Sequence, residues 1–309
     1  MRWLLGLLLV VSAMPAAAQK RIAFTFDDVP RRAGAFLTPD ERTKRLIATL
    51  RRSDVKQAAF FLNPGNIAAD DTTATARIDA YVAAGHVIAN HSATHPSLSK
   101  VSTEAFLADV DRAEAWIAAR RGHRAWLRYP FLDEGRSDKA KRDAVRSGLA
   151  TRGIRNAYVT IDGYDWDLEG RAVAAVAAGK RIDRKALRDL YIETQVGAAE
   201  YYDALAVRAA GRSPMHVILL HETDLAALYL GDLVKALRAK AWTIATMDEA
   251  YADPIAVEAT RYDTPSAQGR LTEMLAWQKG LPAPRWYDRN DSDVLGKLFA
   301  TRVLHEGTP

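Results

Sequence analysis

Seven short, continuous apolar runs, separated by segments with helical patterns, constrain the fold of this chain more than any other feature. Strands that are apolar throughout, rather than at alternate positions, must be covered on both faces, as the strands of a parallel sheet are. The runs are RIAFTF (21–26), QAAFFLN (57–63), HVIAN (86–90), AWLRY (125–129), AYVTI (157–161), HVILLH (216–221) and AWTIATM (241–247). The sequence therefore predicts an α/β fold with a mainly parallel sheet.

Helical patterns fill the gaps between these runs. The first begins at Thr38-Pro39-Asp40-Glu41, a capping box with proline at the first helical position. Four more are predicted at about 104–120, 138–147, 184–210 and 225–240. Strand and helix alternating in this way favour one closed or partly closed (β/α) barrel over two doubly wound halves. The long helical stretch before HVILLH has no strand of its own, so we expect an irregular barrel.

The N-terminal residues 1–18 have the pattern of a secretory signal peptide. Arg2 precedes an apolar segment, and Ala16-Ala17-Ala18 provides small residues for cleavage. The alternative, a membrane anchor, needs ~20 uninterrupted apolar residues, and this run is shorter. We therefore expect export to the periplasm or the medium, with no stable membrane insertion after the segment is removed.

Composition excludes several classes of protein. The chain has no cysteine, which rules out a disulfide framework and any cysteine-based zinc site or thiolate chemistry. With 49% hydrophobic residues, a large core can stabilise it instead. The formal net charge is +5, but the basic residues are scattered rather than clustered, so we predict no nucleic-acid site.

Polar residues follow two of the apolar runs in patterns that suit a metal ion. Asp27 and Asp28 come directly after RIAFTF, where two carboxylates are costly unless a cation or a hydrogen-bond network uses them. His91 and His95 follow HVIAN, and two imidazoles four residues apart can converge on one metal. An ordinary turn before Val29-Pro30, and chance spacing of the histidines, are the alternative readings.

Three further clusters lie at strand ends: Arg128–Phe131 at the end of AWLRY, Asp162–Trp166 after AYVTI, and His221 at the end of HVILLH. Each alone could be a surface arginine, an Asp-Gly turn or a histidine bonded to backbone. Together, five polar clusters lie at the C-terminal ends of five strands, the face where a (β/α) barrel collects its catalytic residues. The remaining histidines receive no predicted role; they are His86, His123, His216 and His305.

At this point the chain resembles the polysaccharide deacetylases, the NodB-homology carbohydrate esterases of family four. Their five ordered motifs are similar to TFDD (25–28), HSATHP (91–96), RYPF (128–131), DGYDW (162–166) and LLH (219–221). The resemblance spans about 21–251 and implies an irregular (β/α) barrel of this type. We assign 19–252 to the catalytic domain and expect 253–309 to form a helical extension packed on the barrel.

The resemblance implies a divalent metal held by Asp28, His91 and His95. Zinc is the first choice, with cobalt, nickel and manganese as alternatives. Three protein ligands leave positions open, as in a catalytic rather than a structural site. Asp27 would be the general base that takes a proton from the attacking water, and Arg128 would hold this aspartate.

Further roles are implied for the acid and for substrate binding. His221 would protonate the leaving group, oriented by Asp165. Phe131 stands where many members have tyrosine, which leaves the backbone N–H available to the oxyanion. Trp166 would line the acetyl pocket, although an ordinary core tryptophan fits equally well. Tyr129 of the same RYPF segment is also assigned to substrate binding.

The expected substrate is an acetylated glycan: peptidoglycan, chitin oligomers, xylan or an exopolysaccharide, with N- or O-acetyl groups. Two alternatives stay open. One is a non-sugar amide (C–N) hydrolase of the same superfamily, which the signal pattern disfavours. The other is a carbohydrate-binding protein that has lost catalysis, which the presence of Asp27, Asp28, His91, His95 and His221 disfavours.

Overall fold

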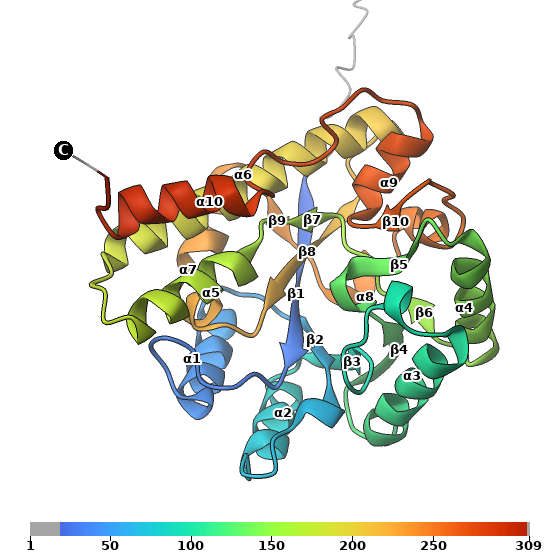
Figure 1. Cartoon of the computed structure of the whole chain (residues 1–309), viewed down its shortest axis with the longest axis horizontal. Coiled ribbons are helices and arrows are strands. Elements are labelled where there is room, and N and C mark those ends of the chain that lie inside the picture. The colour runs from blue at the N-terminus through green and yellow to red at the C-terminus, as the bar shows by residue number, and fades with distance from the viewer. Residues whose placement is uncertain (1–18, 308–309) are drawn as a thin grey trace, which may run out of the picture.

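The computed structural model describes residues 19–307, so the predicted signal peptide lies outside the described residues. Within them, parallel strands form a curled sheet in the order β6-β4-β3-β2-β1-β8-β7, with β9 also pairing with β1 (Figure 1). The strands are β1 (Arg21–Val29), β2 (Ala59–Leu62), β3 (Val87–Asn90), β4 (His123–Leu127), β6 (Arg155–Asn156), β7 (Ile161–Asp162), β8 (Met215–His221) and β9 (Thr243–Ile244). The fold is the predicted α/β, irregular barrel.

Helices surround the sheet on its outer side (Figure 1). They are α1 (Pro39–Arg52), α2 (Ala74–Ala83), α3 (Thr103–Ile117), α4 (Lys139–Thr151), α5 (Asp165–Ala177), α6 (Arg184–Ala210), α7 (Asp224–Ala239), α8 (Met247–Ala250), α9 (Leu271–Gln278) and α10 (Ser292–Leu298). Helix α1 packs against α7, and α6 packs against both α7 and α9. The capping box predicted at Thr38 is present, with the Thr38 side chain accepting from the Glu41 N–H.

Strand β1 is an interior strand of the sheet, paired on both edges. It runs beside β8 from Arg21 to Asp27, while its other edge pairs with β9 at its start and with β2 near its end. Phe26 of β1 stacks on Phe60 of β2 at 5.0 Å between ring centroids, and Phe60 stacks on Tyr81 of α2 at 3.8 Å. This buried aromatic column fixes the inner sheet against its outer helices.

The prediction of one strand over AYVTI (157–161) is wrong. Arg155–Asn156 pairs with β4 at one edge of the sheet, whereas Ile161–Asp162 pairs with β8 at the other edge. The residues between them span the gap, so they cannot belong to one strand, and the barrel stays open there. The apolar run is buried because it closes the core, not because it forms a ladder.

The prediction over AWTIATM (241–247) is also too long, since β9 covers only Thr243–Ile244. A second capping box ends the extended segment: Thr246 accepts from the Glu249 N–H, and the Glu249 side chain accepts from the Thr246 N–H. This local bonding starts α8 three residues after β9 ends. Helices α2 and α5 were not expected from the sequence.

Residues 253–307 contact the rest of the described chain through α9 and α10. Helix α9 packs on α6, and α10 contacts α5. The short strand β10 (Ala267–Gln268) pairs antiparallel with β5 (Asp133–Arg136). Across residues 19–307, no helix is long and apolar enough to cross a membrane.

We predict that Phe60→Ala will lower the free energy of unfolding by ~3–5 kcal/mol, because it removes a fully buried ring from the aromatic column. Urea denaturation followed by circular dichroism would measure the change. Val176→Ala on α5 is the control, since this side chain is 42% exposed and should cost less than ~0.5 kcal/mol. Equal losses in the two variants would contradict the proposed core.

Candidate active site

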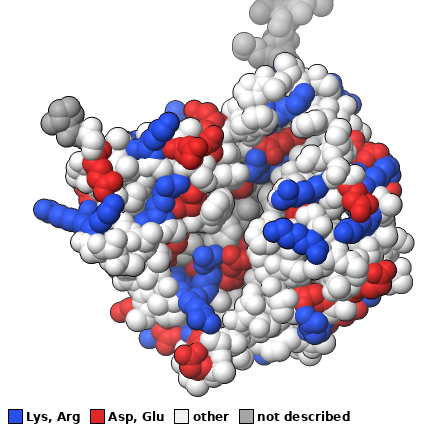
Figure 2. Space-filling view, in the orientation of Figure 1, with Lys and Arg blue, Asp and Glu red and all other residues white. Residues whose placement is uncertain are grey.

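A cavity of about 590 Å³ opens at the C-terminal ends of the parallel strands. Figure 2 shows the surface hollowed near the middle of this face, with basic and acidic side chains inside the hollow. The lining residues come from all five predicted motifs and from the tail: Asp27, Asp28, Arg31, His91, His95, Tyr129, Phe131, Leu132, Asp162, Tyr164, Trp166, Leu219, His221, Gln268, Gly269 and Arg270. The fold thus brings the separate sequence clusters to one place.

Asp28, His91 and His95 form a group that could hold a metal ion. One ligand atom from each lies within 4.8 Å of the others. Asp28 Oδ1 is 3.5 Å from His91 Nε2 and 3.3 Å from His95 Nε2. His91 Nδ1 lies 2.8 Å from the Arg128 carbonyl oxygen, which can only accept, so Nδ1 donates this bond and Nε2 is the ring nitrogen that faces Asp28. The donor set fits a divalent cation of the zinc type.

The protonation states at this group also suit a cation. Burial raises the pKa of Asp28, but the hydrogen bond to His91 and the charges of His221 and Arg31 outweigh burial and hold that pKa well below its usual range. Burial lowers the pKa of His95 to about 4, and the charge of His91 acts in the same direction. At neutral pH the site therefore offers a carboxylate and a neutral His95 imidazole.

The backbone at these residues is strained. Asp28, Ser92 and His95 all have positive φ, at 61°, 64° and 60°, a region that residues other than glycine rarely adopt. Strain of this kind costs of order 1–3 kcal/mol for each residue and persists only where the surroundings hold it. Asp28 and His95 belong to the three-residue group, so two of its members keep a strained backbone that places their side chains.

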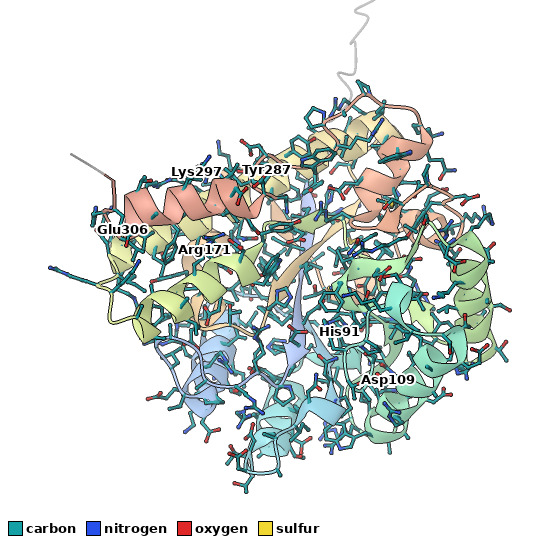
Figure 3. All side chains as sticks on the ribbon, in the orientation of Figure 1. His91, Asp109, Arg171, Tyr287, Lys297 and Glu306 are labelled. Carbon is teal, nitrogen blue, oxygen red and sulfur yellow. The ribbon has the colours of Figure 1, made fainter. Side chains whose placement is uncertain are left out.

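Two side chains hold the loop that carries the histidines. Asn63, just after β2, donates from Nδ2 to the carbonyl oxygens of His91 and Ser92, at 2.6 Å and 3.0 Å. Asp109 of α3 accepts from the backbone N–H of Thr94 at 2.9 Å and from its hydroxyl at 3.0 Å. Figure 3 labels His91 and Asp109 in the lower right part of the view. Neighbouring elements therefore fix the loop.

Asp27 lies beside the three-residue group and is bonded to Arg128. Its Oδ2 is 3.7 Å from His91 Nε2. Arg128 Nη1 is 2.9 Å from both carboxylate oxygens of Asp27, and both side chains are buried. Burial lowers the pKa of Arg128, but the negative charge of Asp27 and a hydrogen bond to Tyr251 raise it above its ordinary value. Arg128 thus stays a cation and holds the carboxylate in one orientation.

His221, at the end of β8, forms the second polar pair of the site. Asp165, the first residue of α5, accepts from His221 twice: Oδ1 lies 2.8 Å from Nδ1, and Oδ2 lies 2.8 Å from the backbone N. Burial alone lowers the pKa of His221, but the charge of Asp165, the hydrogen bond to it and the charge of Asp28 raise that pKa to about 9. The ring is therefore an imidazolium at neutral pH, with Nε2 not engaged by Asp165.

The aromatic residues assigned to substrate binding fall into two groups. Phe131 and Trp166 line the cavity and are 57% and 42% exposed, which is unusual for large apolar side chains. Trp166 is thus not an ordinary core residue. Tyr129 borders the same cavity, but its side chain is 3% exposed and stacks on Phe106 at 5.7 Å. Its ring belongs to a core cluster, and its role in substrate binding stays a prediction.

Sequence analysis missed several residues of the site. Arg31 pairs with Asp28 at 2.7 Å, and Tyr251 bonds Arg128 at 3.2 Å. Gln268 and Arg270 reach the cavity from the tail. Arg31 could have been suspected from its place directly after the TFDD segment and Val29-Pro30. The others lie more than 100 residues from the motif residues they bond, Arg128, Phe131 and Asp162, and no local pattern marks them.

The fold and the site together define a (β/α)-barrel protein with a polar catalytic face and a cation-type ligand group. A family model described as polysaccharide deacetylase matches residues 15–151, which include TFDD, HSATHP and RYPF. This match confirms the resemblance to the polysaccharide deacetylases. No curated protein matches the chain.

Solved structures give the same fold. A chitin deacetylase from Colletotrichum lindemuthianum is 20% identical, with a TM-score of 0.50 over 77% of this chain and 91% of that one. A family 4 pseudoenzyme from Bacillus anthracis is 17% identical, with a TM-score of 0.50 over 75% and 65%. A family 4 carbohydrate esterase from Streptomyces lividans, in complex with acetate, is 21% identical, with a TM-score of 0.49 over 75% and 94%. At these identities the likeness concerns the fold alone, and the two structures with TM-scores of 0.50 support it.

We predict that Asp28→Asn will weaken zinc binding by about 100-fold or more, because it removes the only charged ligand. Replacing a residue that merely hydrogen-bonds a metal ligand already lowers metal affinity by about 10–100-fold, so loss of a ligand should cost at least as much. Asp27→Asn should keep the zinc affinity near that of the wild type, since Asp27 contacts Arg128 rather than completing the ligand group. Competition titration with a zinc chelator would measure both affinities.

Asp248→Asn is the control, because Asp248 is partly exposed, pairs with Arg124 and does not line the cavity. Thermal unfolding should show that every variant is folded. Equal affinities for Asp27→Asn and Asp28→Asn would remove the distinction between the two aspartates.

Proposed function

We propose that this protein is a metal-dependent hydrolase that removes N-acetyl groups, and on some substrates O-acetyl groups, from an extracytoplasmic glycan. One observation carries the proposal: the ligand group of Asp28, His91 and His95 lies in the same cavity as Asp27 and His221. A bare cation site would not need a buried carboxylate beside it and an imidazolium facing it. General base, ligands and general acid are the parts that acetyl hydrolysis requires.

A divalent cation held by Asp28, His91 and His95 would act as a Lewis acid towards the acetyl carbonyl and lower the pKa of a water molecule. Asp27 would accept the proton of the attacking water, and Arg128 holds the Asp27 carboxylate in one orientation. The backbone N–H near Phe131 would stabilise the oxyanion, as one preorganised donor typically does by ~3 kcal/mol.

His221 would complete the reaction by protonating the leaving group. An amine cannot depart as its anion, so N-deacetylation needs an acid, whereas an alkoxide leaves more readily. The imidazolium form required for this step is favoured by Asp165, which raises the pKa of His221 to about 9. Asp165 also bonds the His221 backbone N–H, so the ring and its strand end are oriented together.

The glycan and the compartment are parts of the same proposal. The exposed rings of Phe131 and Trp166 at the cavity suit stacking on sugar faces. Peptidoglycan, chitin oligomers, xylan and exopolysaccharides all carry acetyl groups on sugar rings. The signal pattern in residues 1–18 supports action in the periplasm or the medium rather than on a cytosolic amide.

The proposed function predicts acetate release from at least one acetylated glycan by the zinc-loaded protein. A chelator should abolish the activity, and zinc, cobalt, nickel or manganese should restore it, because the ligand group has one carboxylate and two imidazoles. Acetate would be measured enzymatically across a panel of peptidoglycan, chitin oligomers and acetylated xylan. Turnover that is indifferent to chelation, with no metal found by elemental analysis, would refute metal dependence.

His221→Ala should reduce N-deacetylation ~100-fold or more while reducing cleavage of an activated aryl acetate much less, since only the amide needs an acid. In the wild type, activity should fall as pH rises through the pKa of His221. Asp165→Asn removes the charge that favours the protonated ring, so this alkaline limb should move to lower pH. Initial rates from pH 5 to 10 would test this, and equal losses on both substrates would exclude His221 as the acid.

A further inference from the structure

The chain after β9 contributes a wall of the cavity that the five motifs do not provide. Gln268 and Gly269 lie against the loop that follows β4: Gln268 Nε2 donates to the Phe131 carbonyl at 3.1 Å, and the Gly269 N–H donates to the Leu132 carbonyl at 3.1 Å. The next residue, Arg270, lines the cavity and is the N-cap residue directly before α9. The tail therefore reaches the reacting face itself.

The guanidinium of Arg270 is buried between two carboxylates. Nη1 lies 3.2 Å from Asp162 Oδ2, and Nη2 is bonded to Glu273. All three residues are less than 9% exposed. The Tyr202 hydroxyl, on α6, donates to Glu273 Oε1 at 2.8 Å. A guanidinium suits this place because its planar fork can bond two separate acceptors at once.

Asp162 passes this contact on to the turn that carries the acid pair. Its Oδ1 accepts from the Tyr164 N–H at 2.8 Å, and Tyr164 takes the left-handed conformation, with φ 52°, immediately before α5. The carbonyl oxygen of Asp162 accepts from Asn290 Nδ2 at 3.0 Å. Asp165, which orients His221, is the residue after this constrained turn. The turn is thus held from the tail at both the side chain and the backbone of Asp162.

A buried carboxylate without a partner is costly, so Asp162 can stay ionised and bonded to the turn only while Arg270 compensates its charge. Burial raises the pKa of Asp162, and the Arg270 charge opposes that shift. Loss of the pair would favour a protonated or solvent-seeking Asp162. The charge-assisted bond from the Tyr164 N–H to Asp162 would then weaken or break, and the strained turn could relax and move Asp165.

We propose that Arg270 is a positioning residue for the general acid, acting through Asp162 on the turn that carries Asp165 and hence on His221. The inference rests on the proposed function and extends the active site into the tail. Arg270 does not need to contact the substrate for this role. Its effect should therefore appear in the step that uses His221, rather than in metal binding or in general stability.

The test compares Arg270→Lys and Asp162→Asn with Glu273→Gln. Lysine keeps the charge but lacks the planar fork that bonds the two carboxylates through separate nitrogens, and asparagine keeps the shape of Asp162 but carries no charge to pair with the guanidinium. Glu273→Gln is the matched control, because it removes the other ion pair of the same arginine and leaves the contact with Asp162. All three should lower the melting temperature and keep the zinc content.

The expected result is a change in substrate ratio. Arg270→Lys and Asp162→Asn should reduce kcat for an N-acetylated oligosaccharide ~10-fold more than kcat for an activated aryl acetate, as small misplacements of catalytic groups can cost up to ~100-fold. Glu273→Gln should leave the ratio unchanged. The double variant Arg270→Lys/Asp162→Asn should have the same substrate ratio as Asp162→Asn alone, since both changes interrupt the same chain of contacts. Equal losses on both substrates in all three variants would show a purely structural role and overturn the proposal.

A second readout does not require activity. The ring N–H of His221 bonded to Asp165 should give a downfield proton resonance in the zinc-loaded protein, assigned by its absence in His221→Ala. Arg270→Lys should shift or broaden this resonance, and Glu273→Gln should not. An unchanged resonance in Arg270→Lys would overturn the proposal. If the wild type deacetylates nothing, the proposed function fails, while this resonance still decides the role of Arg270.

Discussion

The buried ion pair between Arg128 and Asp27 is the interaction on which the rest of the site depends. The side chain of Arg128 contacts several segments of the chain. Its Nη1 bonds both Asp27 oxygens, and its Nε donates to the Ala157 carbonyl at 2.6 Å. The guanidinium also lies 4.4 Å from the centre of the Phe61 ring. The carbonyl oxygen of Arg128 sets the orientation of His91. Arg128, the residue directly after β4, thus connects β1, β2 and β3 at their C-terminal ends. Breaking such a pair typically costs 3–5 kcal/mol, because the remaining charge stays buried.

The same cavity gives two histidines opposite protonation states. His95 has a pKa of about 4, because burial is not offset by a carboxylate bonded to its ring in the way Asp165 is bonded to His221. His221 has a pKa of about 9, because Asp165 bonds both its ring and its backbone. A ligand must be neutral and an acid must be protonated, so one residue type serves both purposes through its surroundings. The difference between the two pKa values depends on the position of Asp165. The turn at Tyr164 and its contacts with the tail maintain that position.

Sequence reasoning predicted the features that local patterns encode. The helix expected at 184–210 has those bounds as α6, and the capping box at Thr38 forms as expected. The polar clusters after the strands meet because parallel strands end at one edge of the sheet. The strand predicted over AYVTI was wrong because strand pairing is not encoded locally. Its apolar character reports burial, but whether a buried segment pairs with one neighbour or crosses between two depends on strands far away in the chain.

By itself, the sequence determined which residue types stand at the strand ends, and therefore the chemistry that the site can perform. Two aspartates and two histidines four residues apart indicate a cation site, and the resemblance to the polysaccharide deacetylases implies a base and an acid beside it. Only the tertiary structure decided how these groups are held. Asp27 and Arg128 are 101 positions apart, and Asp162 and Arg270 are 108 apart. Periodicity and capping act over a few residues, whereas a buried charge is satisfied by whichever partner the folded chain brings within hydrogen-bond distance.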